Sequence, residues 1–120
     1  MQVIVEADGG SRGNPGPAGY GAVVLDASGA SVLAERAESI GTASNNVAEY
    51  RGLIAGLEAA IELGADAVAV RMDSKLVVEQ MSGRWQVKHP DMRPLARRAS
   101  QLTTRLESVT FEWIPRERNR

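Results

Sequence analysis

Cysteine is absent from this chain of 120 residues, and histidine occurs once, at position 89. The lack of thiols excludes disulfide bonds and thiolate metal sites, and a single imidazole cannot form a zinc cluster. Any bound metal must therefore be held mainly by oxygen, which favours magnesium, manganese or calcium. No apolar run is long enough to span a membrane, and the N-terminus lacks the basic and apolar regions of a signal peptide. We therefore expect a cytoplasmic protein with no membrane partner.

Net charge is also nearly absent, at −1, but the charges are unevenly distributed. Residues 1–83 carry 5 basic and 11 acidic side chains, a net charge of −6, and residues 84–120 carry 9 basic and 4 acidic, a net charge of +5. This asymmetry is compatible with a metal site beside a phosphate-binding surface. Because twelve of the fourteen basic residues are arginine, it is equally compatible with a coding bias. The charge pattern alone does not indicate nucleic acid binding.

The hydrophobic residues, 43% of the chain, are sufficient for the core of one domain. Their alternation and apolar runs predict five strands, at residues 2–8, 19–25, 31–38, 67–72 and 109–114. Helical spacing predicts three helices, at residues 47–63, 73–81 and 91–106. The first three strands are joined closely enough to form an antiparallel meander. The element order then predicts an α/β fold, with a five-stranded mixed sheet and helices on both faces.

The predicted helix at 47–63 carries glycine at positions 52 and 56 on a stripe of small residues. Each glycine inside a helix costs about 1 kcal/mol relative to alanine. Close approach of another backbone would account for both, so we expect this helix to pack directly on a neighbouring element.

Three acidic residues stand at the ends of predicted elements. Asp8 and Asp73 each follow a strand, and Glu49 lies in the first turn of the long helix. Taken singly, each has an ordinary explanation, as a turn residue, a helix N-cap, or the partner of Asn46 in a capping box. Their joint placement is harder to explain in this way, because α/β folds build sites at the ends of strands and Mg²⁺ prefers carboxylate oxygen. We therefore expect the three carboxylates to converge on divalent metal.

Three segments of the chain resemble, in order and spacing, the successive motifs of type 1 ribonuclease H. These segments are residues 8–21, 45–50 and 72–76. The resemblance implies an RNase H-like fold over nearly the whole chain, with Asp8, Glu49 and Asp73 as the first three catalytic carboxylates. It further implies two catalytic Mg²⁺ ions, for which Mn²⁺ could substitute. The implied reaction is endonucleolytic hydrolysis of the RNA strand of RNA–DNA hybrids, leaving 5′-phosphate and 3′-hydroxyl ends. Asp8 would then bridge the two ions, and Glu49 and Asp73 would complete the site of one of them.

The resemblance also implies a set of residues that bind the substrate. Asn14, Asn45 and Asn46 match residues that lie in the minor groove, where an amide can both donate to and accept from a 2′-hydroxyl. Ser44 matches a hydroxyl that contacts phosphate on the DNA strand, and Arg116 stands near a loop histidine of relatives. The alternative for the three asparagines is structural, as a turn residue before a proline and two residues at a helix start.

The chain departs from the family pattern in two places. A fourth carboxylate would lie a few residues past position 120, so we expect residues 1–120 to be a single domain that lacks its C-terminal helix. The segment 84–92 is too short for the basic protrusion with which many members grip the hybrid. We therefore expect weaker, more salt-sensitive binding through a local patch of Arg84, Lys88, Arg97 and Arg98. The likeness is greatest to the actinobacterial form, which is often followed by a phosphatase-like C-terminal domain.

Two other functions remain open at this point. The first is a hybrid-binding module of the same fold whose catalysis is impaired, which the missing fourth carboxylate favours. The second is another RNase H-like nuclease that acts on DNA. The pair Asn45 and Asn46 speaks against the second, since it suits a group that senses a 2′-hydroxyl.

Overall fold

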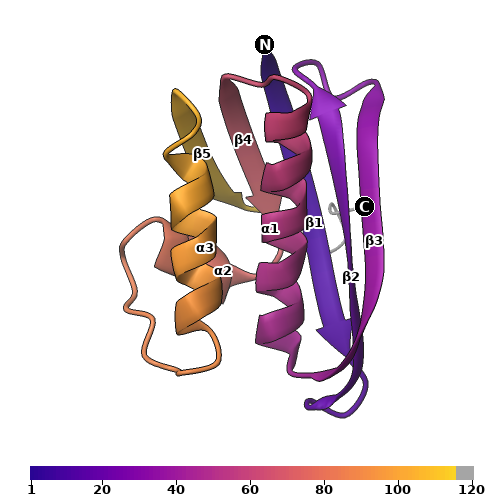
Figure 1. The fold of residues 1–120 in the computed structure, drawn as a ribbon, viewed down its shortest axis with the longest axis vertical. Coiled ribbons are helices and arrows are strands. Elements are labelled where there is room, and N and C mark those ends of the chain that lie inside the picture. The colour runs from indigo at the N-terminus through magenta and orange to yellow at the C-terminus, as the bar shows by residue number, and fades with distance from the viewer. Residues whose placement is uncertain (116–120) are drawn as a thin grey trace.

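The chain folds around one mixed sheet with three helices (Figure 1), and the computed structural model describes residues 1–115. Its elements are β1 (Gln2–Ser11), β2 (Gly16–Asp26), β3 (Val32–Ala43), α1 (Asn45–Glu62), β4 (Ala67–Met72), α2 (Lys75–Met81), α3 (Arg93–Thr103) and β5 (Ser108–Trp113). The strands lie in the order β3-β2-β1-β4-β5. β1, β2 and β3 pair antiparallel, whereas β4 pairs parallel with both β1 and β5. The predicted α/β class, element order and antiparallel meander are confirmed.

The first hairpin is longer than the sequence suggested. Gly9 and Gly10, which were expected to begin a loop, continue β1 and pair with Tyr20 and Gly19 of β2. Pairing with β2 thus outweighs the low strand propensity of glycine. As a result Asp8 lies inside β1 instead of at its end.

Helix α1 packs directly on β1 through its two glycines, as expected. A β-carbon added at Gly56 would come within 2.5 Å of Val5 Cγ1, and one at Gly52 would lie 3.1 Å from the carbonyl oxygen of Asp8. A side chain at position 56 would therefore require Val5 or the helix to shift, and one at position 52 would require a smaller adjustment. This close approach holds the preceding turn, which contains Glu49, against β1.

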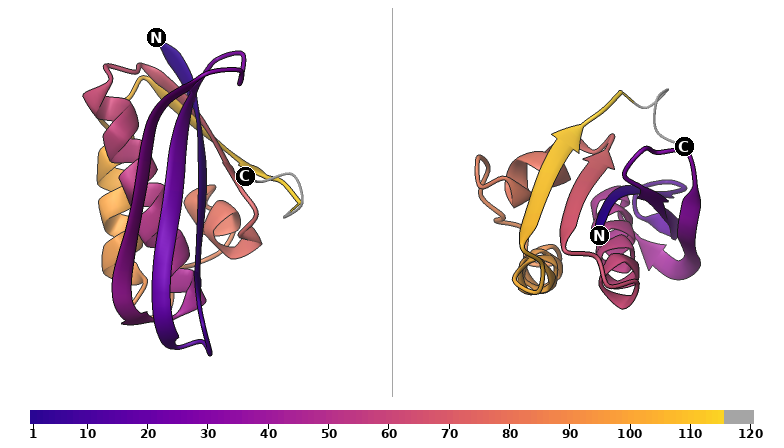
Figure 2. Two further views of the ribbon diagram at one scale, coloured as in Figure 1. Left: turned by 90° about the vertical axis from the view of Figure 1, so that its right-hand side faces the viewer. Right: turned by 90° about the horizontal axis from the view of Figure 1, so that it is seen from above.

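The three helices pack against one another. α1 and α3 lie side by side on the same face (Figures 1 and 2), and α2 contacts both of them. Tyr50 of α1, Val77 of α2 and Leu102 of α3 belong to the same buried cluster, together with Val5 of β1 and Val70 of β4. Residues 1–115 thus contain the five-stranded mixed sheet with packed helices that the sequence predicts.

Crossing a bilayer would require a longer or more apolar helix than any found between residues 1 and 115.

Candidate active site

Parallel pairing of β1 with β4 brings two of the predicted acids to the same edge of the sheet. Ala7 is in register with Met72, so the residues that follow them, Asp8 and Asp73, emerge at the same level from adjacent strands. Glu49 reaches this edge from α1. The three carboxylates each offer an oxygen atom, and these atoms all lie within 4.8 Å of one another. The predicted convergence is therefore present in the structure.

Glu49 reaches the site from the second turn of α1, not from the first, where the sequence placed it. The helix begins at Asn45 with Ser44 as its N-cap, and the Ser44 hydroxyl accepts a 3.2 Å hydrogen bond from the amide of Val47. Asn46 is therefore not a cap, and the capping-box explanation of Glu49 does not apply. Instead, Oε1 of Glu49 accepts a 2.6 Å hydrogen bond from the backbone amide of Gly9 in β1.

The ordinary explanations of Asp73 and Asp8 also differ from what the structure contains. Helix α2 is capped by Ser74, whose hydroxyl oxygen accepts from the amide of Val77 at 3.3 Å, so Asp73 is not the N-cap. Asp8 is not a turn residue, because it pairs with Gly21 within the β1–β2 ladder.

Burial makes Glu49 an unusual acid. Its side chain is among the few buried charged groups, with 6% of the residue exposed. The pKa of Glu49 is raised from 4.5 to about 8, chiefly by burial and also by the charges of Asp8 and Asp73, against the opposing effect of the Gly9 amide. Oε2 of Glu49 is buried and accepts no hydrogen bond from a protein donor. A buried carboxylate oxygen beside two further carboxylates fits a divalent cation, which would supply the missing positive partner.

The amide side chains join the tip of the β1–β2 hairpin to the start of α1. Oδ1 of Asn45 accepts from the amide of Ser11 at 2.7 Å and from its hydroxyl at 3.1 Å. Oδ1 of Asn14 accepts from the amide of Asn45 at 2.9 Å. Asn46 is exposed at the first turn of α1. Asn14 and Asn45 thus hold the hairpin against the helix, whereas the side chain of Asn46 is exposed to solvent. Arg116, also expected to bind substrate, lies outside the described residues.

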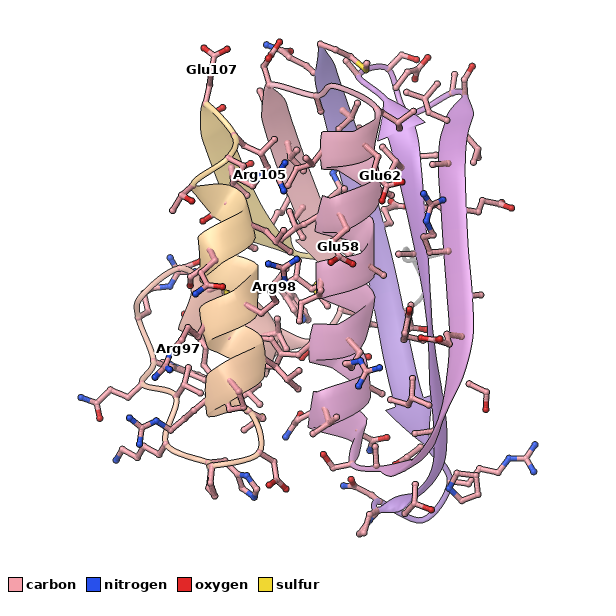
Figure 3. All side chains as sticks on the ribbon, viewed as in Figure 1. Glu58, Glu62, Arg97, Arg98, Arg105 and Glu107 are labelled. Atoms are coloured by element: carbon pink, nitrogen blue, oxygen red, sulfur yellow. The ribbon has the colours of Figure 1, made fainter. Side chains whose placement is uncertain are left out.

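The expected basic patch is already half neutralised. Arg84 pairs with Glu79, and Arg98 pairs with Glu58 of α1 at 3.1 Å. Figure 3 shows Arg98 directed toward Glu58, whereas Arg97 points away from α1. Lys88 and Arg97 are exposed, and they remain the members of the patch best able to contact phosphate.

A hollow of about 840 Å³ adjoins Asp8 over β1, β2 and β3. Its lining includes the carboxylates of Glu6, Glu35 and Glu38, and one guanidinium, that of Arg36. This excess of negative charge is unfavourable for a phosphate backbone. We therefore expect a nucleic acid to approach the site from the side of Asn46.

Sequence reasoning did not single out Gly9 and Trp113, two residues that contact the site. The amide of Gly9 holds Glu49, and the indole Nε1 of Trp113 donates a 3.1 Å hydrogen bond to the backbone carbonyl of Asp73. Both contacts join residues 40 positions apart in the chain. The alignment of strand ends could have indicated Trp113, because it closes β5 opposite the last residue of β4.

Comparison with protein families and curated sequences agrees with this geometry. A family model described as "Reverse transcriptase-like" matches residues 6–120. The bifunctional protein Rv2228c of Mycobacterium tuberculosis is 64% identical over 119 residues, which make up 99% of this chain and 33% of that protein. Ribonuclease HI of Halobacterium salinarum is 45% identical over 112 residues, 93% of this chain and 56% of that protein. The chain thus spans about a third of the length of the first curated relatives that it matches.

Solved structures show the same likeness. The N-terminal RNase H domain of Rv2228c superposes with a TM-score of 0.98 at 63% identity, covering 99% of this chain and 86% of that one. LC11-RNase H1 in complex with an RNA/DNA hybrid superposes with a TM-score of 0.90 at 40% identity, covering 98% of this chain and 88% of that one.

Proposed function

Because this chain belongs to the ribonuclease H family, we propose that it is an endonuclease that hydrolyses the RNA strand of RNA–DNA hybrids. The observation that carries the proposal is the convergence of Asp8, Glu49 and Asp73, whose carboxylate oxygens lie within 4.8 Å of one another. The solved complex of LC11-RNase H1 with an RNA/DNA hybrid supports the choice of substrate. The products would carry 5′-phosphate and 3′-hydroxyl ends.

The three carboxylates would hold the divalent metal, for which we propose two Mg²⁺ ions, with Mn²⁺ as a substitute. Oxygen ligands and the absence of cysteine suit these ions better than zinc. When bound, such ions polarise a phosphate and lower the pKa of a coordinated water. The contribution of the protein is to fix its ligands: Asp8 is held in the β1 ladder, and Glu49 is held by the Gly9 amide. None of the ion pairs formed within residues 1–115 supplies the buried Oε2 of Glu49 with a cation.

The start of α1 would contact the substrate. The N-terminus of an 18-residue helix carries a partial positive charge, which favours a phosphate. The hydroxyl of Ser44 accepts from the Val47 amide, so its own proton is available to donate to such a group. The exposed Asn46 is the residue best placed to sense a 2′-hydroxyl, and Asn14 and Asn45 would shape the surface beside it. Arg116 is kept as a further substrate contact on the family resemblance.

A cleavage assay with labelled strands tests the proposal. The full-length protein should cut the RNA strand of a hybrid in the presence of Mg²⁺, and it should leave single-stranded RNA and duplex DNA of the same sequence intact. Equal cutting of duplex DNA would support the alternative of a DNA nuclease. Hybrid retention in a gel without any cutting would support the alternative of an impaired binding module.

We further propose that residues 1–120 form one RNase H-like domain which a C-terminal helix with a fourth carboxylate completes. The word "bifunctional" in the name of the relative Rv2228c, and the share of that protein that this chain spans, support a further domain, which we propose to be phosphatase-like. Hybrid cleavage by residues 1–120 should be much slower than cleavage by a version extended through the next helix, at the same Mg²⁺ concentration. Equal rates would show that no fourth carboxylate is needed.

A further inference from the structure

Trp113, the last residue of β5, contacts the candidate site without being one of its acids. It is in register with Met72, the last residue of β4, so its side chain lies where the chain leaves the sheet toward α2. From there its indole Nε1 donates a 3.1 Å hydrogen bond to the backbone carbonyl of Asp73. The hydrogen bond therefore reaches the main chain of an expected metal ligand, not its carboxylate.

The contact lies at a junction between two regular elements. The amide of Ile114 donates to the carbonyl of Met72 at 2.9 Å, which closes the β4–β5 ladder. Ser74 then caps α2. The carbonyl of Asp73 lies between the last pair of the β4–β5 ladder and the first residue of α2. The indole supplies a donor at this junction.

We propose that Trp113 is a positioning residue for the metal site, whose indole N–H fixes the Asp73 main chain and thereby the direction of its carboxylate. The inference rests on the proposed function to the extent that Asp73 is a metal ligand. A ligand held in place before the cation arrives loses less conformational entropy on binding, so the hydrogen bond strengthens cation binding. Removal of a group that orients a metal ligand typically weakens metal affinity by about tenfold or more.

The surroundings of Trp113 favour this role over simple packing. Nearly half of the residue, 48%, remains exposed, whereas a core tryptophan would bury most of its surface. Trp85 provides a matched comparison, because it is 46% exposed and its hydrogen bond to Glu79 uses its backbone amide. Replacing the indole of Trp85 therefore removes a similar ring without removing a contact to the site.

The test measures binding of Mn²⁺ alone by isothermal titration calorimetry, using the full-length protein and the variants Trp113→Phe, Trp85→Phe and Asp8→Asn. A fourth variant carries 3-benzothienylalanine at position 113, which keeps the shape of the indole but lacks the N–H donor. We expect both changes at position 113 to weaken Mn²⁺ binding by about tenfold. Trp85→Phe should bind as the unchanged protein does, and Asp8→Asn defines the binding that occurs elsewhere in the chain. Hybrid KM at saturating metal should change little at position 113.

The outcomes distinguish failure of the proposed metal site from failure of the proposed role of Trp113. Unchanged Mn²⁺ affinity in the benzothienyl variant overturns the role of Trp113, and it does so even if Trp113→Phe fails to fold. If Asp8→Asn weakens binding while the position-113 variants do not, only the Trp113 assignment fails. If Asp8→Asn itself leaves binding unchanged, the metal site and the role of Trp113 both fail.

Discussion

The backbone amide of Gly9 in β1 donates a 2.6 Å hydrogen bond to the carboxylate of Glu49 in α1. This contact joins a strand and a helix that are 40 residues apart in sequence, at the point where the three acids meet. It depends on the absence of a side chain at position 9, because a β-carbon there would overlap the backbone of Ala48 and lie 2.7 Å from the amide nitrogen of Glu49. Several properties of the site depend on this close approach.

Replacement of Gly9 by alanine should displace α1 from β1. We expect Gly9→Ala to lower the free energy of unfolding by about 1–3 kcal/mol, the usual cost of overpacking, and to reduce hybrid cleavage because Glu49 moves. Urea denaturation and the cleavage assay measure the two effects. Gly10→Ala is the control, since the nearest atom to its added β-carbon would be Asn45 Oδ1, at 3.8 Å. Equal behaviour of the two variants would contradict the packing argument.

The raised pKa of Glu49 predicts how stability depends on pH in the absence of metal. Its pKa is about 8 in the folded protein and 4.5 without the influence of the fold, so between these values the folded state retains a proton that the unfolded state has lost. The free energy of unfolding should therefore fall as pH rises from about 4.5 to about 8, by up to about 1.4 kcal/mol for each pH unit in that interval. In chelator, Glu49→Gln should lose this fall, and Mg²⁺ should stabilise the unchanged protein more at pH 8 than at pH 5. Parallel stability curves for the two proteins would show that Glu49 titrates normally.

The two neighbouring asparagines should differ in what their removal affects. Asn45→Ala should cost about 1 kcal/mol of stability, since Oδ1 of Asn45 binds Ser11. Asn46→Ala should change stability by less than about 0.5 kcal/mol, because the side chain is exposed, and should instead reduce the preference for hybrid over duplex DNA. Urea denaturation and gel-shift affinities measure both. If Asn46→Ala leaves the preference for hybrid over duplex DNA unchanged, Asn46 does not contact the substrate.

Charge reversal should weaken hybrid binding more at the exposed members of the basic patch, Lys88 and Arg97, than at Arg98, which forms an ion pair. Lys88→Glu and Arg97→Glu should each weaken hybrid binding and reduce the slope of log K against log salt by about 0.9 if the residue neutralises one phosphate. Arg98→Glu should have a smaller effect on the salt slope, because Arg98 is engaged with Glu58. If the salt slope is unchanged in the first two variants, the hybrid does not follow this surface.

Local patterns were enough to predict the class of fold and the order of its elements. The alternation of apolar residues in β1 and the stripe of small residues in α1 indicate which faces of these elements are buried. The sheet and the packing of α1 could therefore be predicted. Boundaries were less accurate, since Ser44 and Asn46 are both good capping residues and only the fold selects Ser44. Likewise Gly9 and Gly10 suggest a turn until their pairing with β2 is known.

The convergence of the three acids was predictable because the sequence places each at the end of an element, although β1 continues past Asp8 in the structure. The groups that hold them were not, because the contacts of Gly9 with Glu49 and of Trp113 with Asp73 depend on tertiary packing. No local pattern separates the paired Arg98 from the exposed Arg97, since the partner of Arg98 lies on another helix.

The most direct test of the account measures Mg²⁺-dependent cleavage of the RNA strand of a hybrid by the full-length protein and by Asp8→Asn, Glu49→Gln and Asp73→Asn. Glu62→Gln, an exposed residue of α1 that pairs with Arg36, is the control for loss of one negative charge. We predict that each of the three site variants loses cleavage by at least about a hundredfold, in line with the loss of a group that acts at the reacting centre, and that Glu62→Gln retains it. Cleavage at the unchanged rate by any of the three site variants would contradict the assignment of these carboxylates as the catalytic metal ligands.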